Sequence, residues 1–266
     1  MLAKHAQDWA VDVLKILREV LEKAKTLPGF KEILEIQTAS RRTPLMYAII
    51  SGNFEATKIF IEYGANYKLM TESGSPIIMA IESNSVTMLD YLLTLKDCPS
   101  LTQTDLAGLT PMYVACYNSK SDIVKYLLDR PEWVSLLKSR GPFNATIFHA
   151  LADQDFTELA ELIITTIKER ENAISILGEI VTTQDESEYG DTALHLAAKE
   201  GYTGFLKVCL EVLPNKKEIV EKCLNEAGET MIQVAEEENH EEAILYLQSL
   251  LGIQPANGIG YYCVTF

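Results

Sequence analysis

The 266-residue sequence predicts an all-α fold built from pairs of short helices that repeat along the chain. Two observations lead to this prediction. Six times, a threonine or serine opens a short run of apolar residues and alanine, and most runs are followed by a segment whose apolar residues recur three and four positions apart. One pair of helices cannot bury its own apolar stripe, so the pairs are expected to stack in a single elongated core.

The first 38 residues predict a helical cap on this stack. Residues 3–26 have an amphipathic pattern, and Pro28 and Gly29 end it before a short apolar segment at residues 30–36. A cap is expected because an uncovered terminal repeat would leave a hydrophobic face in water. The apolar side of the predicted helix carries Trp9, Val13, Leu17, Val20 and Leu21.

The best preserved of the six copies is the segment Gly190-Asp-Thr-Ala-Leu-His-Leu-Ala-Ala-Lys-Glu-Gly201. It resembles the opening of an ankyrin repeat, in which a threonine caps the first helix, a leucine and a histidine follow, and a glycine ends the helix. The resemblance implies an all-α ankyrin-repeat solenoid of about six helix-turn-helix repeats joined by β-turn or hairpin-like loops. The other copies open at Thr43, Ser75, Thr110, Thr146 and Thr230, and the best copy opens at Thr192.

The intervals between the six openings are 32, 35, 36, 46 and 38 residues, whereas the ankyrin repeat has a period of 33. The segments that connect the repeats are therefore longer than in the standard ankyrin repeat. Additional helical segments are expected near residues 131–137, 171–181 and 216–224. We assign residues 1–38 to the cap, residues 39–251 to the repeats and residues 252–266 to a C-terminal tail.

Composition excludes several classes of function. A net charge of −15 argues against general binding to nucleic acid, because the phosphate backbone is bound by basic surface. Five cysteines without a CxxC pair argue against a disulfide framework and for a reducing compartment. The sequence has no run of eighteen apolar residues and no apolar secretory signal, so we expect a cytoplasmic protein.

The sequence offers few residues for chemistry. It has no HExxH, GxSxG, GxxxxGK[ST] or GxGxxG motif, so we expect no catalysis, no cofactor and no metal. His149 and His195 occupy the histidine position of the repeat, where the ankyrin resemblance implies a structural hydrogen-bonding role. Cys116 and Cys209 are expected to be core residues. The acidic run at residues 236–242 lacks the spacing of a calcium loop and is interpreted as a solvated helix face.

In the ankyrin family, the loop before each helix pair and the end of its first helix line a concave groove. The resemblance therefore implies a monomeric, non-catalytic scaffold or adaptor that binds a partner protein in this groove. Carried onto this sequence, the groove positions are Arg41, Arg42, Ile50, Ser51, Glu72, Ser73, Glu82, Ser83, Asp105, Leu106, Tyr117, Asn118, Phe143, Asp153, Gln154, Glu188, Tyr189, Lys199, Glu200, Glu237 and Glu238.

These positions change from basic through aromatic to acidic along the chain. Residues 171–250 carry 17 acidic and 5 basic side chains, a net charge of −12. We therefore expect the partner to have a basic element near the last two repeats, because opposite charges set the rate and orientation of encounter. The alternative is that Glu237, Glu238 and their neighbours only keep the protein soluble.

The last four residues, Cys263 to Phe266, resemble a prenylation box, and the terminal phenylalanine would favour a geranylgeranyl group. Thr265 is a poor match, and the last basic residue upstream is Lys222, so membrane attachment is expected only if Cys263 carries a lipid. Other interpretations are an arbitrary end of the sequence, an apolar tail folded onto the last repeat and a PDZ-type ligand. The tail also keeps open an alternative function, a bacterial effector or targeting module of a larger protein acting in a host cytosol.

Overall fold

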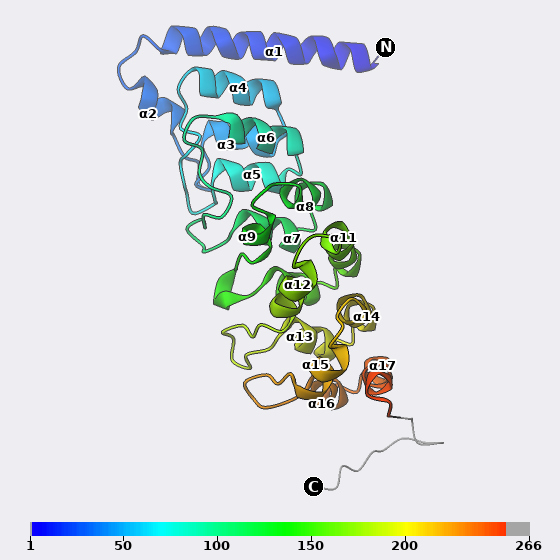
Figure 1. The fold of residues 1–266 in the computed structure, drawn as a ribbon. Coiled ribbons are helices and arrows are strands. Elements are labelled where there is room, and N and C mark those ends of the chain that lie inside the picture. Colours follow the sequence, from blue (N-terminus) through cyan, green and yellow to red (C-terminus); the bar gives the residue numbers. More distant parts are fainter. Residues whose placement is uncertain (1, 254–266) are drawn as a thin grey trace. The chain divides into compact units, whose positions relative to one another are not determined.

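The computed structural model describes residues 2–253, and it describes side chains from residue 13 onward. Within that range the regular structure is helical, with three isolated antiparallel bridges and no strand (Figure 1). The all-α prediction is confirmed. The chain divides into two compact units, residues 1–142 and the residues from 143 onward, which we call the N-terminal and C-terminal units.

The N-terminal unit contains two cap helices and three repeats. In each repeat an inner helix follows the threonine or serine opening, and an outer helix follows the inner one. The third repeat adds a short third helix. In chain order the helices are α1 (Leu2–Ala24), α2 (Phe30–Leu34), α3 (Pro44–Ile50), α4 (Phe54–Glu62), α5 (Pro76–Glu82), α6 (Val86–Thr94), α7 (Pro111–Tyr117), α8 (Ser121–Leu128) and α9 (Trp133–Leu137).

The C-terminal unit contains the other three repeats, and the first two of them have a third helix. These third helices, with α9, lie where the long intervals predict additional helical segments. The helices are α10 (Ile147–Asp153), α11 (Thr157–Ile167), α12 (Ala173–Val181), α13 (Ala193–Lys199), α14 (Thr203–Glu211), α15 (Lys216–Lys222), α16 (Met231–Glu237) and α17 (Glu241–Leu251). A single 3-10 turn, η1 (Pro142–Asn144), precedes α10.

Each of the six predicted openings caps an inner helix. The side-chain oxygen accepts a hydrogen bond from the backbone N–H three residues later, at 3.3–3.4 Å in every copy. This bond satisfies one of the N–H groups that a helix start leaves without a partner. The register of the fourth copy, in which isoleucine replaces the usual proline, is therefore the same as in the others.

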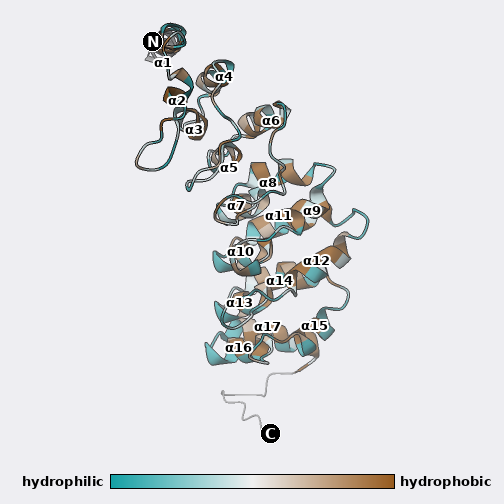
Figure 2. Cartoon of the chain, turned by 90° about the vertical axis from the view of Figure 1, so that its left-hand side faces the viewer, coloured by the Kyte–Doolittle hydropathy of each residue, from teal (hydrophilic) through white to brown (hydrophobic). Residues whose placement is uncertain are grey.

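The core of each unit forms where neighbouring inner helices meet. In the N-terminal unit α3 packs on α5 and α5 on α7, and in the C-terminal unit α10 packs on α13 and α13 on α16. Ala80, Ala115, Ala152 and Ala197 are fully buried on these helices, and the small side chain lets adjacent helices approach closely. Figure 2 shows the inner helices α10, α13 and α16 with hydrophilic colour at one end, which is the end where their charged residues lie.

The cap helix α1 differs from its prediction in the face that it buries. Leu21 is buried, but Val13 and Val20 are 43% and 56% exposed. The helix is attached to α4 largely through polar groups: Arg18 pairs with Glu62 at 2.7 Å, and the Tyr63 hydroxyl donates to Glu22 at 2.8 Å. With these contacts in place, Val13 and Val20 remain exposed, so only part of the apolar side of the predicted helix is buried. The side chain of Trp9 lies outside the described range.

Candidate functional site

The predicted groove residues lie on two kinds of structural element. One is the finger loop, by which we mean the residues just before each opening: 38–42, 71–74, 105–109, 143–145, 184–191 and 224–229. The other is the C-terminal end of each inner helix. None of the predicted residues is buried. Those that are half-buried are Arg42, Ile50, Ser73, Glu82, Ser83, Asp105 and Lys199, and the others are exposed.

The C-terminal unit places two aromatic residues at the same position of consecutive finger loops. Phe143 and Tyr189 each lie three residues before their opening threonine and are 71% and 49% exposed. Phe143 has a φ of 52°, a conformation that side-chain-bearing residues rarely adopt. Its carbonyl accepts a hydrogen bond from the N–H of Glu186 at 2.6 Å, which ties this finger to the next. Exposed aromatic rings on connected loops are suited to protein contacts.

Two buried histidines connect neighbouring fingers of the C-terminal unit. Nδ1 of His149 and of His195 lies 2.8 Å from the hydroxyl of its own capping threonine. Nε2 of His149 lies 2.9 Å from the carbonyl oxygen of Asp191, and Nε2 of His195 lies 3.0 Å from that of Glu229. Burial lowers the pKa of His195 below its ordinary value, which favours the neutral ring. These bonds are the structural role that the ankyrin resemblance implies.

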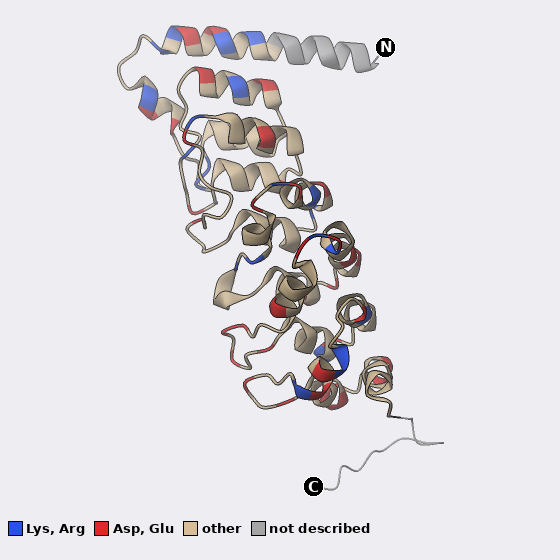
Figure 3. Ribbon diagram, in the orientation of Figure 1, with Lys and Arg blue, Asp and Glu red and all other residues tan. Residues whose placement is uncertain are grey.

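Carboxylates gather on the groove side of the C-terminal unit. The finger loops before α13 and α16 carry several of them (Figure 3). Lys199, at the end of α13, lies with its ammonium group 4.9 Å from the centre of the Tyr189 ring. Gln154 donates to Asp153 at 2.6 Å. The exposed carboxylates that the sequence predicts in this groove are Asp153, Glu188, Glu200, Glu237 and Glu238.

In the N-terminal unit, the structure brings six predicted residues together around one cavity of about 460 Å³. One more, Arg41, forms an exposed ion pair with Glu72 of this cavity at 3.5 Å. Ile50 and Ser51 end α3 and do not line the cavity. The six are Glu72, Ser73, Glu82, Asp105, Tyr117 and Asn118.

Tyr113 also lines this cavity, although it is not among the residues predicted from the sequence. Tyr113 occupies the third position after its opening threonine, the position of His149 and His195 in the later repeats. This shared position in the repeat could have identified Tyr113 as a candidate from the sequence. Tyr47, one residue further along in its repeat, was also missed: its exposed hydroxyl lies 2.9 Å from Ser40 Oγ.

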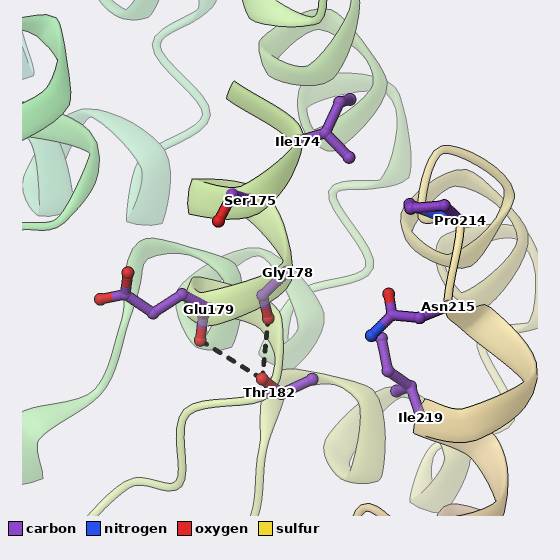
Figure 4. Close-up of a pocket in the computed structure, with 8 residues that line it drawn as sticks. All are labelled: Ile174, Ser175, Gly178, Glu179, Thr182, Pro214, Asn215 and Ile219. Atoms are coloured by element: carbon purple, nitrogen blue, oxygen red, sulfur yellow. Dashed lines mark hydrogen bonds between the residues drawn. The ribbon is translucent and has the colours of Figure 1, made fainter. Parts of the chain in front are cut away.

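A larger cavity, of about 560 Å³, lies between the third helices α12 and α15 of the C-terminal unit (Figure 4). Its one ionisable lining residue is Glu179, and Thr182 donates a hydrogen bond to the Gly178 carbonyl at 2.7 Å. This lining offers no nucleophile with a base beside it. It contains none of the predicted groove residues. The full lining is Ile174, Ser175, Gly178, Glu179, Thr182, Pro214, Asn215 and Ile219.

The remaining chemical candidates are structural. Cys116 and Cys209 are buried, and burial raises the pKa of both thiols, so neither is activated as a nucleophile. Within residues described by the structure, no three histidine, cysteine or carboxylate groups are placed to hold a metal ion. No described helix has both the length and the apolar character needed to cross a membrane. Cys263, the candidate lipidation site, lies outside the described residues.

Comparisons with known proteins agree with the repeat pattern. The sequence matches the family model "Ankyrin repeats (3 copies)" over residues 11–103 and 70–133, and the model "Ankyrin repeat" over residues 189–225. An ankyrin repeat protein of Rickettsia bellii is 26% identical over 155 residues, which cover 58% of this chain and 19% of that protein. The mouse ankyrin repeat and SAM domain-containing protein 6 is 28% identical over 125 residues, 46% of this chain and 14% of that protein. The chain thus spans a fifth or less of these relatives.

Solved structures show the same fold. The ankyrin repeat domain of Bcl-3 superposes with a TM-score of 0.65 at 18% identity, covering 89% of this chain and 93% of that one. A chain from the complex of the Bd0816 predatory endopeptidase of Bdellovibrio bacteriovorus with immunity protein Bd3460 gives a TM-score of 0.58 at 18% identity, covering 80% and 99%. The predicted ankyrin-repeat fold is therefore confirmed.

Proposed function

Because this chain belongs to the ankyrin-repeat family, whose repeats are protein-protein interaction modules, we propose that it is a non-catalytic scaffold that binds a partner protein through the groove residues. The groove consists of the finger loops and the C-terminal ends of the inner helices. A basic element of the partner contacts the C-terminal unit.

The observation that carries this proposal is a difference between the aromatic side chains of the two faces: several on the outer helices form hydrogen bonds within the protein, and those on the fingers are exposed. On the outer helices, Tyr63, Tyr126 and Tyr246 each direct the hydroxyl to a carboxylate of a neighbouring helix. On the groove side, Phe143 and Tyr189 are exposed on the fingers. Aromatic residues exposed in this way provide much of the binding energy of protein interfaces.

Ion pairing also differs between the two faces: charged side chains are paired on the outer face, and several carboxylates on the groove side are unpaired among the described residues. On the outer face of the C-terminal unit, Lys207 pairs with Glu242 at 3.3 Å and Lys216 pairs with Glu211. On the groove side, the described residues provide no ion-pair partner for Glu188, Glu237 or Glu238. Carboxylates left unpaired on one face attract and orient a basic partner.

Site-specific photo-crosslinking tests the proposal. A photoreactive residue is placed at Tyr189 or Glu237 in the groove, and at the exposed Glu161 of α11 as a control on an outer helix. In lysate of the cells that produce the protein, both groove positions are expected to crosslink the same protein, and Glu161 to crosslink none. The substitution Phe143→Ala is expected to reduce the groove crosslink. Equal crosslinking from Glu161, or no common product from the two groove positions, would contradict the proposal.

Reversing Glu237 and Glu238 to lysine tests the basic element once that partner is known. The association rate at low salt is expected to fall by about tenfold or more, and the difference should vanish at high salt because ions screen exposed charges. An unchanged rate would mean that these glutamates serve solubility alone.

Prenylation of Cys263 is a separate prediction, which mass spectrometry of the protein made in eukaryotic cells checks.

A further inference from the structure

The cavity in the N-terminal unit is a half-open pocket in the groove. It lies between the second and third repeats, and its walls come from two finger loops and from the inner helices α5 and α7. Its volume of about 460 Å³ is within the range of small-ligand pockets. The lining is completed by Gly74, Ala107, the ring of Pro142 and the apolar side chains of Ile78, Leu109 and Val114.

One wall of the cavity is a pair of stacked tyrosine rings. Tyr113 and Tyr117 lie one turn apart on α7, with ring centroids 6.3 Å apart and an angle of 11° between the ring planes. The backbone of Gly141 packs directly on the Tyr113 ring: a Cβ atom at Gly141 would lie 2.3 Å from Tyr113 Cε2. Gly141 thus leaves room for the Tyr113 ring. Tyr117 stacks beside it with 48% of its surface exposed.

The same cavity holds carboxylates with unused hydrogen-bonding capacity. The carboxylate of Glu82, the last residue of α5, has no hydrogen bond or ion pair with any described residue. Burial raises the pKa of its carboxyl, and the nearby Asp105 carboxylate acts in the same direction. Asp105 is fixed because its Oδ1 accepts from the N–H groups of Ala107 and Leu109, both at 2.9 Å, which leaves Oδ2 for a ligand.

Among the described residues, no cation forms an ion pair with the carboxylate of Glu82 or Asp105. Arg42 and Lys120 lower the pKa of Glu82 through space, but neither forms an ion pair with it within 4 Å. Arg41 pairs with Glu72 at the exposed rim instead. A partly buried carboxylate without a close donor is costly, and a cation that enters the cavity removes that cost.

We propose that this cavity binds an arginine side chain of the partner protein, with the guanidinium plane on the Tyr117 ring and its N–H groups directed at Glu82 and Asp105. The proposal rests on the proposed function, since the bound partner supplies the arginine. Arginine fits better than lysine because its planar, delocalised cation stacks on an aromatic face and donates to two acceptors at once. The carboxylates disfavour an anion.

Titration of the 266-residue chain with blocked amino acids tests the site without the natural partner. The probes are N-acetyl-arginine methylamide, its lysine counterpart and its citrulline counterpart, which is nearly isosteric with arginine but uncharged. Binding is followed by chemical-shift changes of backbone amides in NMR spectra. The arginine probe is expected to shift the amides of Tyr117 and Asn118 with a dissociation constant on the order of millimolar, and the citrulline probe to bind about tenfold more weakly.

Matched variants locate the site. Glu82→Gln keeps the shape of the side chain and removes its charge, and it should weaken the arginine probe by about tenfold. Glu161→Gln, an exposed glutamate on α11, should leave binding unchanged. If the spectrum of Glu82→Gln shows a loss of fold, Tyr117→Leu replaces it and should also weaken the arginine probe, because the stacking surface is gone.

The proposal would be overturned by equal binding of the arginine and citrulline probes, by lysine binding as tightly as arginine, or by unchanged binding in the folded Glu82→Gln or Tyr117→Leu variant. An absence of shifts at the cavity would overturn it as well. None of these outcomes affects the crosslinks from Tyr189 and Glu237. Failure of the arginine site and failure of the proposed function are therefore separate results.

Discussion

The two units start their inner helices with different chemistry. In the N-terminal unit, proline follows the capping residue in all three repeats, at Pro44, Pro76 and Pro111. Proline fixes the backbone for the first helical turn and has no N–H to leave unpaired. In the C-terminal unit no inner helix begins with proline. The N-terminal repeats therefore add a rigid proline to the capping hydrogen bond that all six repeats share.

In the C-terminal unit, the third residue of the inner helix takes part in capping instead. His149 and Gln233 each accept from the backbone N–H of their capping threonine, which completes a reciprocal capping pair. His149 and His195 also reach the finger of the following repeat. The equivalent positions of the first two repeats are Met46 and Ile78, which are buried. Hydrogen bonds from this position therefore connect neighbouring fingers in the C-terminal unit, whereas buried apolar side chains fill it in the first two repeats.

The largest expected effect comes from removing the histidine connection. His195→Ala is expected to lower the free energy of unfolding of the C-terminal unit by about 2–4 kcal/mol, because it removes the ring's hydrogen bonds to the Thr192 hydroxyl and the Glu229 carbonyl and opens a cavity at a buried position. Hydrogen exchange, resolved by residue, should show lost protection in the C-terminal unit and little change in α3 and α5. Equal loss in both units would contradict this difference.

Glycine replacement gives the next effect. Gly201 and Gly52 end equivalent helices with φ of 74° and 69°. A Cβ atom at Gly201 would lie 2.5 Å from His240 Nδ1, whereas Gly52 has open space. We expect Gly52→Ala to cost about 1 kcal/mol from backbone strain alone. Gly201→Ala should cost about 2–3 kcal/mol because a contact must also move. Urea unfolding measures both, and equal costs would mean that His240 moves aside freely.

Acid should weaken the C-terminal unit more than the N-terminal unit. Because burial lowers the pKa of His195 in the folded state, the unfolded chain binds the proton more readily. The stability that the neutral ring provides is complete above its unfolded pKa of about 6.5 and is lost as pH falls through the lowered folded value. Thermal melting at pH 7.5 and pH 5.5 should show a smaller decrease for His195→Gln than for the unaltered protein. An identical decrease would place the acid sensitivity elsewhere.

The smallest effect is expected from adding or removing the proline that follows the capping residue. Ala193→Pro introduces into α13 the proline that the N-terminal repeats have at this position. It is expected to stabilise the protein by about 0.5 kcal/mol, since proline restricts the unfolded chain and the first helical position loses no hydrogen bond. Pro44→Ala should cost a similar amount. Chemical denaturation compares the two, and destabilisation by Ala193→Pro would show that the start of α13 differs in geometry from that of α3.

Local sequence chemistry explains most of what could be predicted. The six capping residues and the periodicity of the outer helices are properties of short segments, so Thr43 and Thr192 could be placed without knowledge of their neighbours. The groove positions followed from family resemblance, and the structure places all of them on accessible fingers and helix ends. Their role in binding a partner stays a prediction.

The sequence by itself determined where each repeat opens, because a capping hydroxyl and its helix lie within a few residues of each other. Only the tertiary structure decided which face of α1 is buried, since that depends on Arg18 meeting Glu62 across 44 residues of sequence. It also decided that Gly141 meets the Tyr113 ring and that Glu82 and Asp105 line one cavity. Such contacts join residues far apart in the sequence, and no local pattern specifies them.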